Sequence, residues 1–383
     1  MLSLAAATAT GAMTLAACGS LLGLDGIDYE GAPDASSIAR DASASGDASV
    51  SGDASSIGDA GEGGALHDVS VRFDAPTVIT QATAPQAIAV DDSRLYWIDQ
   101  DGTNGASVRS IAKDGTGTVT TIATAQPSPA DIAVDDDNVY WSVSQPPPTG
   151  DGATSCLAMM ASKAADAGPP ACVTMAAYAT ARMTITESEV VLLVAGAPAS
   201  DPFIGYAPKF TGSTFESVQT MGAAQAIAAT NTKMYVGNGN GNHIDALSLP
   251  GLVFETNLCL TNCGNAPSVD MTIDTNAENV LWVTSTGQVF SAPIVSSTSS
   301  GTLLAALPNP ALRMARDGAY VYVTAQAAGV VYAVPLFGAD AGASFSALVS
   351  GQPAPYGVAV DANNVYWTNG DGSIRAVGAP AAL

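Results

Sequence analysis

The sequence is poor in basic residues and in histidine. Lysine and arginine together number 12, against 35 aspartates and glutamates, which gives a formal net charge of −23. A chain with so few cations cannot neutralise phosphates, so it is not expected to bind nucleic acid or to dock on anionic lipid through a basic patch. The two histidines are His67 and His243. This scarcity excludes histidine-rich metal sites and most histidine-centred catalysis.

The N-terminal segment has the features of an export signal. Residues 2–17 are small and apolar and lead into the run LAACG at 15–19. The stretch has the length of a secretory h-region and is too short to span a membrane. Because no lysine or arginine precedes it, either the true start lies upstream of Met1 or export relies on the α-amino charge.

The run LAACG resembles the lipobox of bacterial lipoproteins. The resemblance implies that residues 1–18 form the signal peptide and lipobox, with Cys18 diacylated on sulfur as the mature N-terminus. Several acyl chains anchor a protein firmly without a spanning helix. In that family an aspartate after the cysteine favours the inner membrane. Since Gly19 stands there, the resemblance implies the outer membrane of a Gram-negative bacterium.

Residues 19–68 form a low-complexity segment of Asp, Ala, Ser and Gly. They hold ten acidic residues and one arginine, and no aromatic residue follows Tyr29. Such a segment buries too little apolar surface to offset its ordering entropy, so we expect a disordered tether that spans roughly 40 Å. An acidic spacer and a neutral linker are both open interpretations. No calcium loop of the DxDxDG type with a closing Glu is present.

A repeated phrase runs through residues 69–383. Clear copies are AIAVDDSRLYWID at 87–99, DIAVDDDNVYWSV at 131–143 and GVAVDANNVYWTN at 357–369. All four tryptophans share one position of the phrase, and the spacings at that position are 44, 51, 44, 46, 41 and 44 residues. The aligned residues are Trp97, Trp141, Leu192, Val236, Trp282, Val323 and Trp367. A period of about 40–45 residues is typical of four-stranded propeller blades.

Each copy divides into short strands. Residues 118–124, 130–134 and 139–143 are predicted strands, and 135–138 is an Asp/Asn turn. Further strands are predicted at 107–112, 288–294, 329–336 and 373–377. No helix of ten or more residues is expected beyond the signal peptide. We therefore predict an all-β fold, a seven-bladed β-propeller of four-stranded blades.

The two ends of the array are expected to meet. The last unit ends at 373–377 without an outer strand, whereas TVITQ at 77–81 resembles TVTTI at 118–122. We predict that this N-terminal strand completes the last blade, which removes exposed sheet edges that would template aggregation.

The segments VYWTN at 365–369 and YWID at 96–99 resemble the YWTD repeat of LDL-receptor-like propellers. Those relatives have six blades and seven units are counted here, so their ligand sites are not carried over. The layout of acylated cysteine, acidic tether and propeller also resembles surface lipoproteins of Gram-negative bacteria. The second resemblance implies an extracytoplasmic protein of the cell envelope.

Four cysteines remain beside Cys18, an even number that favours disulfides in an exported protein. We expect the pairs Cys156–Cys172 and Cys259–Cys263, each within one inter-strand excursion. The first would clip the longest insertion, and closing a loop of about 17 residues contributes roughly 3 kcal/mol. The alternatives are a four-thiolate zinc site and a redox-active CxxxC pair.

Three patterns have both a chemical and a structural interpretation. In GNGNGNHIDAL at 237–247, His243 could act as a base with Asp245, or the run could be a hairpin turn. The acids at 91–92 and 135–137 could bind a metal, but their recurrence favours turns. The Tyr-Trp pairs could stack on a ligand, but alternation on a strand favours core packing.

No catalytic residue, metal or cofactor is assigned. We expect a monomeric, non-catalytic binding or interaction module, with a protein, peptide or glycan ligand on a ring face or at the central channel. The alternatives are a propeller-type lyase, hydrolase or dehydrogenase with its site at the channel, and a structural component of an envelope complex. A carboxylate-ringed metal would favour the enzyme, and an exposed apolar patch would favour protein binding.

Overall fold

The structure is a computed structural model of the chain. It describes residues 74–102, 105–144, 155–164, 168–176, 179–195, 203–219, 224–238, 243–259, 263–264, 266–274, 278–294, 301–336 and 344–381. The chain divides into two units, Met1–Glu62 and Gly63–Leu383, and every described residue lies in the second. The expected anchor at Cys18, the tether at 19–68 and the domain boundaries at 18 and 68 lie outside the described residues and stay predictions.

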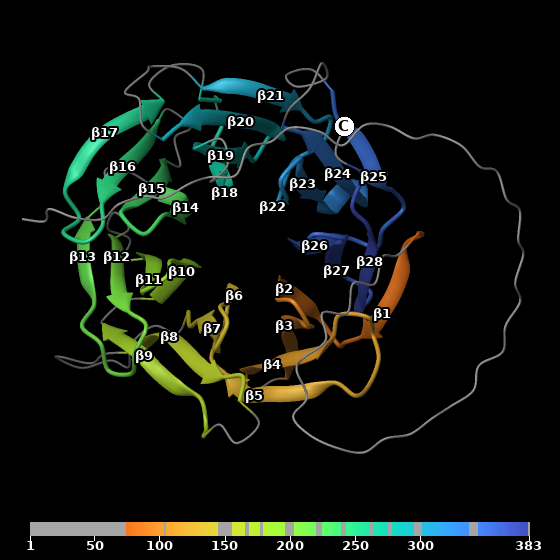
Figure 1. Cartoon of the computed structure of the whole chain (residues 1–383), viewed down its shortest axis with the longest axis horizontal. Coiled ribbons are helices and arrows are strands. Elements are labelled where there is room, and N and C mark those ends of the chain that lie inside the picture. The colour runs from red at the N-terminus through yellow and green to blue at the C-terminus, as the bar shows by residue number, and fades with distance from the viewer. Residues whose placement is uncertain are drawn as a thin grey trace, which may run out of the picture. The chain divides into compact units, whose positions relative to one another are not determined.

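Seven antiparallel four-stranded sheets form a ring of blades (Figure 1). Blades 1 to 3 are β2 (Pro85–Val90), β3 (Arg94–Gly102), β4 (Gly105–Ala112) and β5 (Thr120–Gln126); β6 (Ile132–Val134), β7 (Asn138–Ser142), β8 (Ser155–Ser162) and β9 (Ala171–Ala176); and β10 (Ala179–Ile185), β11 (Glu189–Ala195), β12 (Phe203–Pro208) and β13 (Glu216–Gln219). Blades 4 and 5 are β14 (Ala224–Ala229), β15 (Lys233–Asn238), β16 (Ile244–Ser248) and β17 (Phe254–Cys259); and β18 (Ser268–Asp274), β19 (Asn279–Thr284), β20 (Gln288–Pro293) and β21 (Thr302–Ala306). Blades 6 and 7 are β22 (Arg313–Arg316), β23 (Tyr320–Ala325), β24 (Val330–Pro335) and β25 (Ser346–Val349); and β26 (Pro355–Val360), β27 (Asn364–Asn369), β28 (Ser373–Gly378) and β1 (Thr77–Gln81).

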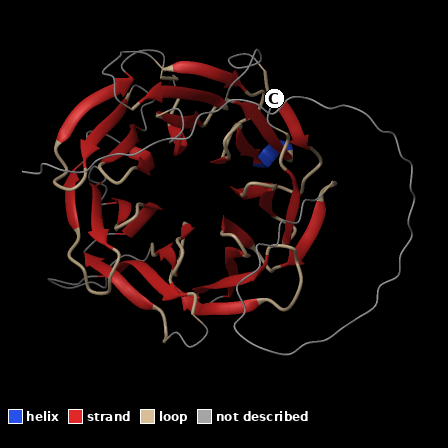
Figure 2. Cartoon of the chain, viewed as in Figure 1, coloured by secondary structure: helices blue, strands red, loops and turns tan. Residues whose placement is uncertain are grey.

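The all-β, seven-bladed prediction is confirmed. Figure 2 shows strands throughout the ring, and the one helix in the described part of the chain is a 3₁₀ turn, η1 (Gln326–Ala328). No helix among the described residues is long and apolar enough to cross a membrane. The strand predicted at 118–124 begins and ends two residues later, as β5. Residues 118–119 of the predicted strand continue the alternation of the strand but lie in the loop before β5.

The ring closes as expected from the sequence. The N-terminal strand β1 pairs antiparallel with β28, from Thr77 opposite Ala376 to Gln81 opposite Ser373. Ile79 of β1 joins a buried cluster that also holds Trp97 of blade 1 and Tyr366 of blade 7. The last blade therefore takes its outer strand from the other end of the array.

The Tyr-Trp pairs are the core of the ring. All four tryptophan side chains are fully buried, and successive side chains on a strand point to opposite faces of the sheet. Tyr96 packs with Trp141 of the next blade, and Tyr366 packs with Trp97 across the closure. The same contact recurs for Tyr140 with Leu192, Tyr235 with Trp282 and Tyr322 with Trp367. The core-packing interpretation is confirmed.

The acids of the repeated phrase hold the turn between the first two strands of a blade. Asp91 accepts hydrogen bonds from the backbone N–H groups of Ser93 (2.8 Å) and Arg94 (2.7 Å) and from the hydroxyl of Tyr96 (2.8 Å). The same backbone bonds recur at Asp135, Asp317 and Asp361. The turn interpretation is therefore confirmed.

Three lysines link neighbouring blades through these turn acids. Each lysine follows the third strand of its blade and reaches the turn aspartate of the preceding blade. The pairs are Lys113–Asp361 (3.3 Å), Lys163–Asp91 (2.6 Å) and Lys209–Asp135 (2.8 Å). Three of the four lysines of this chain therefore form ion pairs between neighbouring blades.

Both expected disulfides are present. Cys156–Cys172 joins β8 to β9, with a Cα–Cα distance of 5.9 Å, and Cys259–Cys263 joins the end of β17 to the loop that follows it. The first bond differs in one respect from expectation. It ties two paired strands of blade 2 to each other instead of clipping an insertion outside the sheet, because residues 156–172 contain the hairpin between those strands.

Candidate binding site in the central channel

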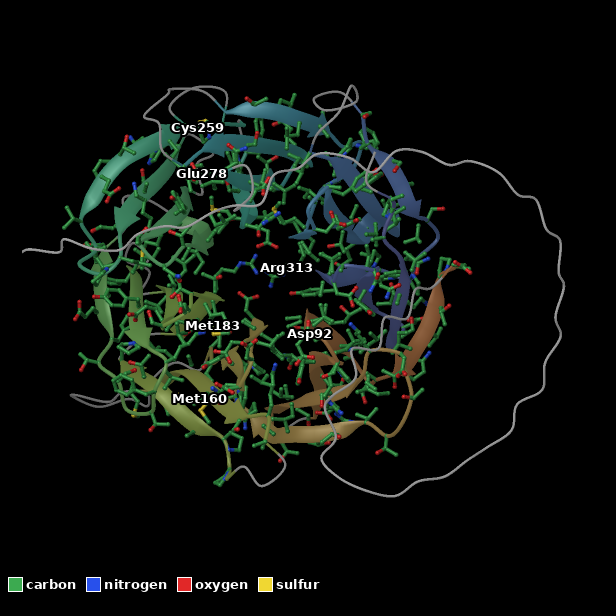
Figure 3. All side chains as sticks on the ribbon, in the orientation of Figure 1. Asp92, Met160, Met183, Cys259, Glu278 and Arg313 are labelled. Carbon is green, nitrogen blue, oxygen red and sulfur yellow. A yellow bond between two sulfur atoms is a disulfide. The ribbon has the colours of Figure 1, made fainter. Side chains whose placement is uncertain are left out.

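One position recurs in every blade, directly before the inner-strand residue that pairs with the aligned tryptophan position. In the clear copies it is the first residue of the repeated phrase, and it is called the phrase start below. In chain order these residues are Ala87, Asp131, Arg182, Ala226, Asp270, Arg313 and Gly357. Six of the seven, with the apolar residue after each phrase start, line a cavity of about 150 Å³ between the innermost strands of all seven blades. Figure 3 shows Arg313 and Met183 on the inner side of the ring.

A β-bulge precedes this position in five blades. A bulge leaves one residue out of the ladder and re-aims the side chains beside it. Here it also turns backbone carbonyls toward the neighbouring blade. Gln86 O accepts from Thr368 Oγ1 at 2.6 Å, and Tyr356 O accepts from Thr324 Oγ1 at 2.8 Å. The bulges thus set the inner strands in fixed positions around the cavity.

Asp131 of blade 2 faces two guanidinium groups. Its Oδ1 lies 3.0 Å from Nη2 of Arg313, from blade 6, and 3.7 Å from Nη1 of Arg182, from blade 3. Its Oδ2 accepts the backbone N–H of Met183 at 3.0 Å. Both oxygens of one carboxylate are therefore engaged, and two cations share a single counter-ion.

Arg182 extends from blade 3 past blade 4 to blade 5. Its Nε donates to Gln225 O at 3.2 Å and its Nη2 donates to Val269 O at 2.8 Å. Both acceptors are bulged residues on their inner strands. At the phrase start of blade 4, Ala226 packs in the core cluster of Tyr235 and Trp282 and does not line the cavity.

Asp270 of blade 5 forms no ion pair in the described part of the chain. Its carboxylate accepts the backbone N–H groups of Met314 (2.9 Å) and Met271 (3.1 Å). No lysine or arginine nitrogen among the described residues lies within 4.0 Å of it. Burial raises the pKa of Asp270 to about 6, with Arg182 opposing the rise and Asp131 adding to it. Its charge therefore changes near neutral pH.

The remaining side of the cavity is formed by small residues and one aromatic ring. Gly357 of blade 7 is required by close approach, because a Cβ there would lie 2.4 Å from Gln86 O. The ring of Tyr356 lies 5.8 Å from the Arg313 guanidinium, a favourable cation–π distance. Burial raises the pKa of Tyr356, so its hydroxyl stays protonated.

A second, larger hollow of about 980 Å³ lies between blades 1 and 2, beside the turns between their first two strands. Four of its charged groups are engaged within the framework. Lys163 binds Asp91, Lys209 binds Asp135, and Arg94 donates to Ser110 Oγ at 3.0 Å. The other two, Asp92 and Asp136, are exposed turn acids. The central cavity is the better candidate because its acid Asp270 is less exposed than these two and forms no ion pair in the described part of the chain.

His243 and Asp245 do come together, with Nε2 and Oδ1 3.3 Å apart. Burial raises the pKa of Asp245 and His243 opposes the rise. The pair lies at the start of β16, and neither residue lines the central cavity. The rest of the expected hairpin turn, 239–242, lies outside the described residues. In the described part of the chain, no three His, Cys, Asp or Glu side chains are grouped so as to hold a metal ion.

Sequence reasoning missed the four charged residues of the cavity. Asp131 stands in the clear copy of the phrase at 131–143, but that copy assigns it no role, and Arg182, Asp270 and Arg313 fall outside the clear copies. A signal was available at the first phrase position, where charged residues replace the small residues of blades 1, 4 and 7. What the spacing does not show is that Arg313 reaches across the ring to blade 2.

Comparisons with known proteins support the propeller fold. No protein-family model matches the chain, and no curated protein matches it. The solved structures similar to it include virginiamycin B lyase from Staphylococcus aureus, at TM-score 0.55 and 11% identity over 80% of this chain and 99% of that one. The computationally designed Ika8 protein matches at TM-score 0.53 and 13% identity over 79% and 99%. Apo AztD from Citrobacter koseri matches at 0.50 and 11% over 75% and 80%. At such identities the likeness shows a shared propeller fold and no shared activity.

Proposed function

We propose that this protein is a non-catalytic binding module of the cell envelope whose ligand occupies the central cavity. The observation that carries the proposal is the divergence at one repeat position. Packing and turn residues recur from blade to blade, whereas the phrase start brings two acids and two arginines to one cavity. Burying charged groups costs free energy unless they are paired, and Asp270 accepts two backbone N–H groups but forms no ion pair among the described residues. A ligand that pairs with the charged side chains of the cavity would explain why they are placed there.

The proposed location rests on separate features. The Cys156–Cys172 and Cys259–Cys263 bonds favour an oxidising compartment. The lipobox resemblance at 15–19 supports an outer-membrane lipoprotein anchored through Cys18, and the segments at 96–99 and 365–369 support a YWTD-like propeller. In this proposal the acidic segment 19–68 is a tether that separates the propeller from the membrane.

A thermal-shift screen tests the binding role. The protein is melted with separate panels of amino acids, sugars, short peptides, carboxylates and amines, and an Arg313→Gln variant is the control. A ligand at 100 times its Kd stabilises the native state by about 2.7 kcal/mol. We expect a compound that raises the Tm of the wild type and not of the variant. Equal shifts in both would place the ligand elsewhere, and mass-spectrometric conversion of the compound would refute a non-catalytic role.

Fractionation tests the anchor independently. Cys18→Ala should move the protein from the membrane fraction to the soluble fraction, because the acyl chains provide the membrane affinity. A Cys18→Ala protein that stays with the membrane would contradict the anchor and leave the cavity untouched.

A further inference from the structure

We propose that the central cavity binds a small zwitterion, an α-amino acid or a compound of similar size, with its ammonium group on Asp270 and its carboxylate on Arg313. The inference rests on the proposed binding function and adds to it the chemical class of the ligand. It follows from the charges, their spacing and the size of the cavity.

Asp270 supplies the anionic half of the site. Two backbone N–H groups hold its carboxylate in place, one from its own strand and one from β22. Two such bonds leave lone pairs on both oxygens. A carboxylate that lines a cavity without a cation within 4.0 Å in the described chain is costly to keep ionised. An ammonium group supplies three donors and the missing charge.

Arg313 supplies the cationic half. Its Nη2 contacts Asp131, but Asp131 also faces Arg182, so one carboxylate balances two guanidiniums. Arg182 spends its Nε and Nη2 donors on backbone carbonyls of blades 4 and 5. Arg313 lines the cavity with one nitrogen on Asp131 and its guanidinium near the Tyr356 ring. A guanidinium has five N–H donors in a planar fork that matches a carboxylate.

The two halves stand on adjacent inner strands. Asp270 is on β18 and Arg313 is on β22, and the bond from Met314 N to Asp270 ties these strands together at the same level. The two side chains nevertheless do not form an ion pair, because Arg313 reaches to Asp131 instead. A molecule that carries an ammonium and a carboxylate on one carbon atom, as an α-amino acid does, can bridge them.

The cavity is small. Its volume of about 150 Å³ matches that of an engineered protein cavity that binds benzene, which has about six non-hydrogen atoms. Glycine and alanine have five and six non-hydrogen atoms, on the order of that number. Apolar side chains of Ile227, Met271 and Met314 line the wall, which suits a hydrogen or a methyl group in place of a polar side chain.

Ligands that carry charge of only one sign fit less well. A divalent cation would need both acids, but the oxygens of Asp131 are engaged by Arg182, Arg313 and the backbone. An inorganic anion would pair with the arginines and leave Asp270 unpaired. The zwitterion is the one class that satisfies both halves.

Isothermal titration calorimetry at pH 7.5 tests the inference on the full protein. The probes are glycine and L-alanine, with propionate as the analogue that lacks the ammonium and isopropylamine as the analogue that lacks the carboxylate. We expect L-alanine to bind at least tenfold more tightly than either analogue. Equal affinity for propionate or isopropylamine, or no binding of glycine and L-alanine at millimolar concentration, would overturn the proposal without any variant.

Variants locate the site. Asp270→Asn and Arg313→Gln should each weaken L-alanine binding at least tenfold, whereas Asp92→Asn, which removes the charge of an exposed turn acid, should leave it unchanged. Circular dichroism and melting verify that each variant is folded. Unchanged affinity in Asp270→Asn refutes the assignment. If L-alanine and glycine do not bind but another compound of the thermal-shift panels binds through Arg313, the zwitterion proposal is refuted and the binding function stands. If no compound of the panels binds through Arg313, the proposed binding function is refuted as well.

Discussion

The two ends of the innermost strands differ in how strictly they repeat. At the turn end, Asp91, Asp135, Asp317 and Asp361 stand at the same position and make the same backbone bonds. At the channel end, the equivalent position carries alanine, aspartate, arginine or glycine. Residues that repeat maintain the framework, because every blade has the same packing problem. Residues that diverge at a shared position are the ones that can form a single, asymmetric site.

The largest effect is expected where the framework repeats in the core. Trp282 is fully buried, lies 5.4 Å from the ring of Phe290 in a stacked arrangement, and donates from Nε1 to Cys263 O at 3.0 Å. Trp282→Ala should destabilise the protein by about 3–5 kcal/mol, measured as a fall in the urea midpoint. Met175→Ala, at a side chain 53% exposed, is the control and should change stability by less than about 0.5 kcal/mol. Similar losses in the two variants would contradict the assigned core.

The framework was predictable from sequence because its physics is local and repeated. The tryptophan register gave the blade count, and the alternation around residues 96–97 predicted burial on both faces of the sheet. The resemblance of 77–81 to an outer strand predicted how the ring closes. The disulfide pairs followed from their nearness in the chain, although the hairpin between Cys156 and Cys172 was missed.

The site was not predictable in the same way. Asp131 and Arg313 are 182 positions apart, and their contact depends on how a side chain crosses the channel. The absence of a cation at Asp270 is likewise a property of the assembled ring. Spacing identifies equivalent positions, but it does not show that Arg182 donates to carbonyls of bulged residues or that Arg313 pairs with Asp131.

Asp91, one of the repeated turn acids, tests the turn end of the innermost strands. Its substitution should cause the next largest change in stability. Burial alone would raise the pKa of Asp91, but the bonds from Lys163 and from the backbone of Ser93 outweigh it and lower the pKa. Its contribution is therefore present above the ordinary aspartate pKa and is lost as the pH falls below about 4. Asp91→Asn should cost about 1–3 kcal/mol at pH 7 and progressively less in acid. The neighbouring Asp92→Asn should cost little at any pH, and equal effects of the two would contradict the turn's role.

Asp270→Asn tests the phrase-start position, which differs between blades. Whereas Asp91→Asn should destabilise the protein at pH 7, Asp270→Asn should stabilise it. Because burial raises the pKa of Asp270 to about 6, the native state binds a proton more readily than the unfolded chain. Stability is therefore lost as the pH rises from about 4 to about 6. Arg182 opposes this shift and Asp131 adds to it, and the raised pKa already contains both effects. Because two pKa units correspond to roughly 2–3 kcal/mol, the variant without ligand should be more stable than the wild type by roughly that amount at pH 7.5 and close to it at pH 4. Melting curves at the two pH values measure this, and a destabilised variant at pH 7.5 would contradict the unpaired acid.

The smallest expected change in stability comes from a comparison of two lysines, one that binds a neighbouring blade and one that binds within its own blade. Lys209 binds Asp135 of the preceding blade and lies 5.2 Å from the Tyr140 ring, whereas Lys233 binds Glu255 inside blade 4, with both side chains about one-third exposed. Lys209→Met should cost about 0.5–1 kcal/mol and Lys233→Met close to zero, since exposed pairs contribute little. Salt should reduce the first cost, because the Debye length falls to about 3 Å at 1 M. Equal costs measured by urea denaturation would mean that the lysine links are surface pairs like any other. A larger cost at Lys209 would show that the lysines of this acid-rich chain act where one repeat meets the next.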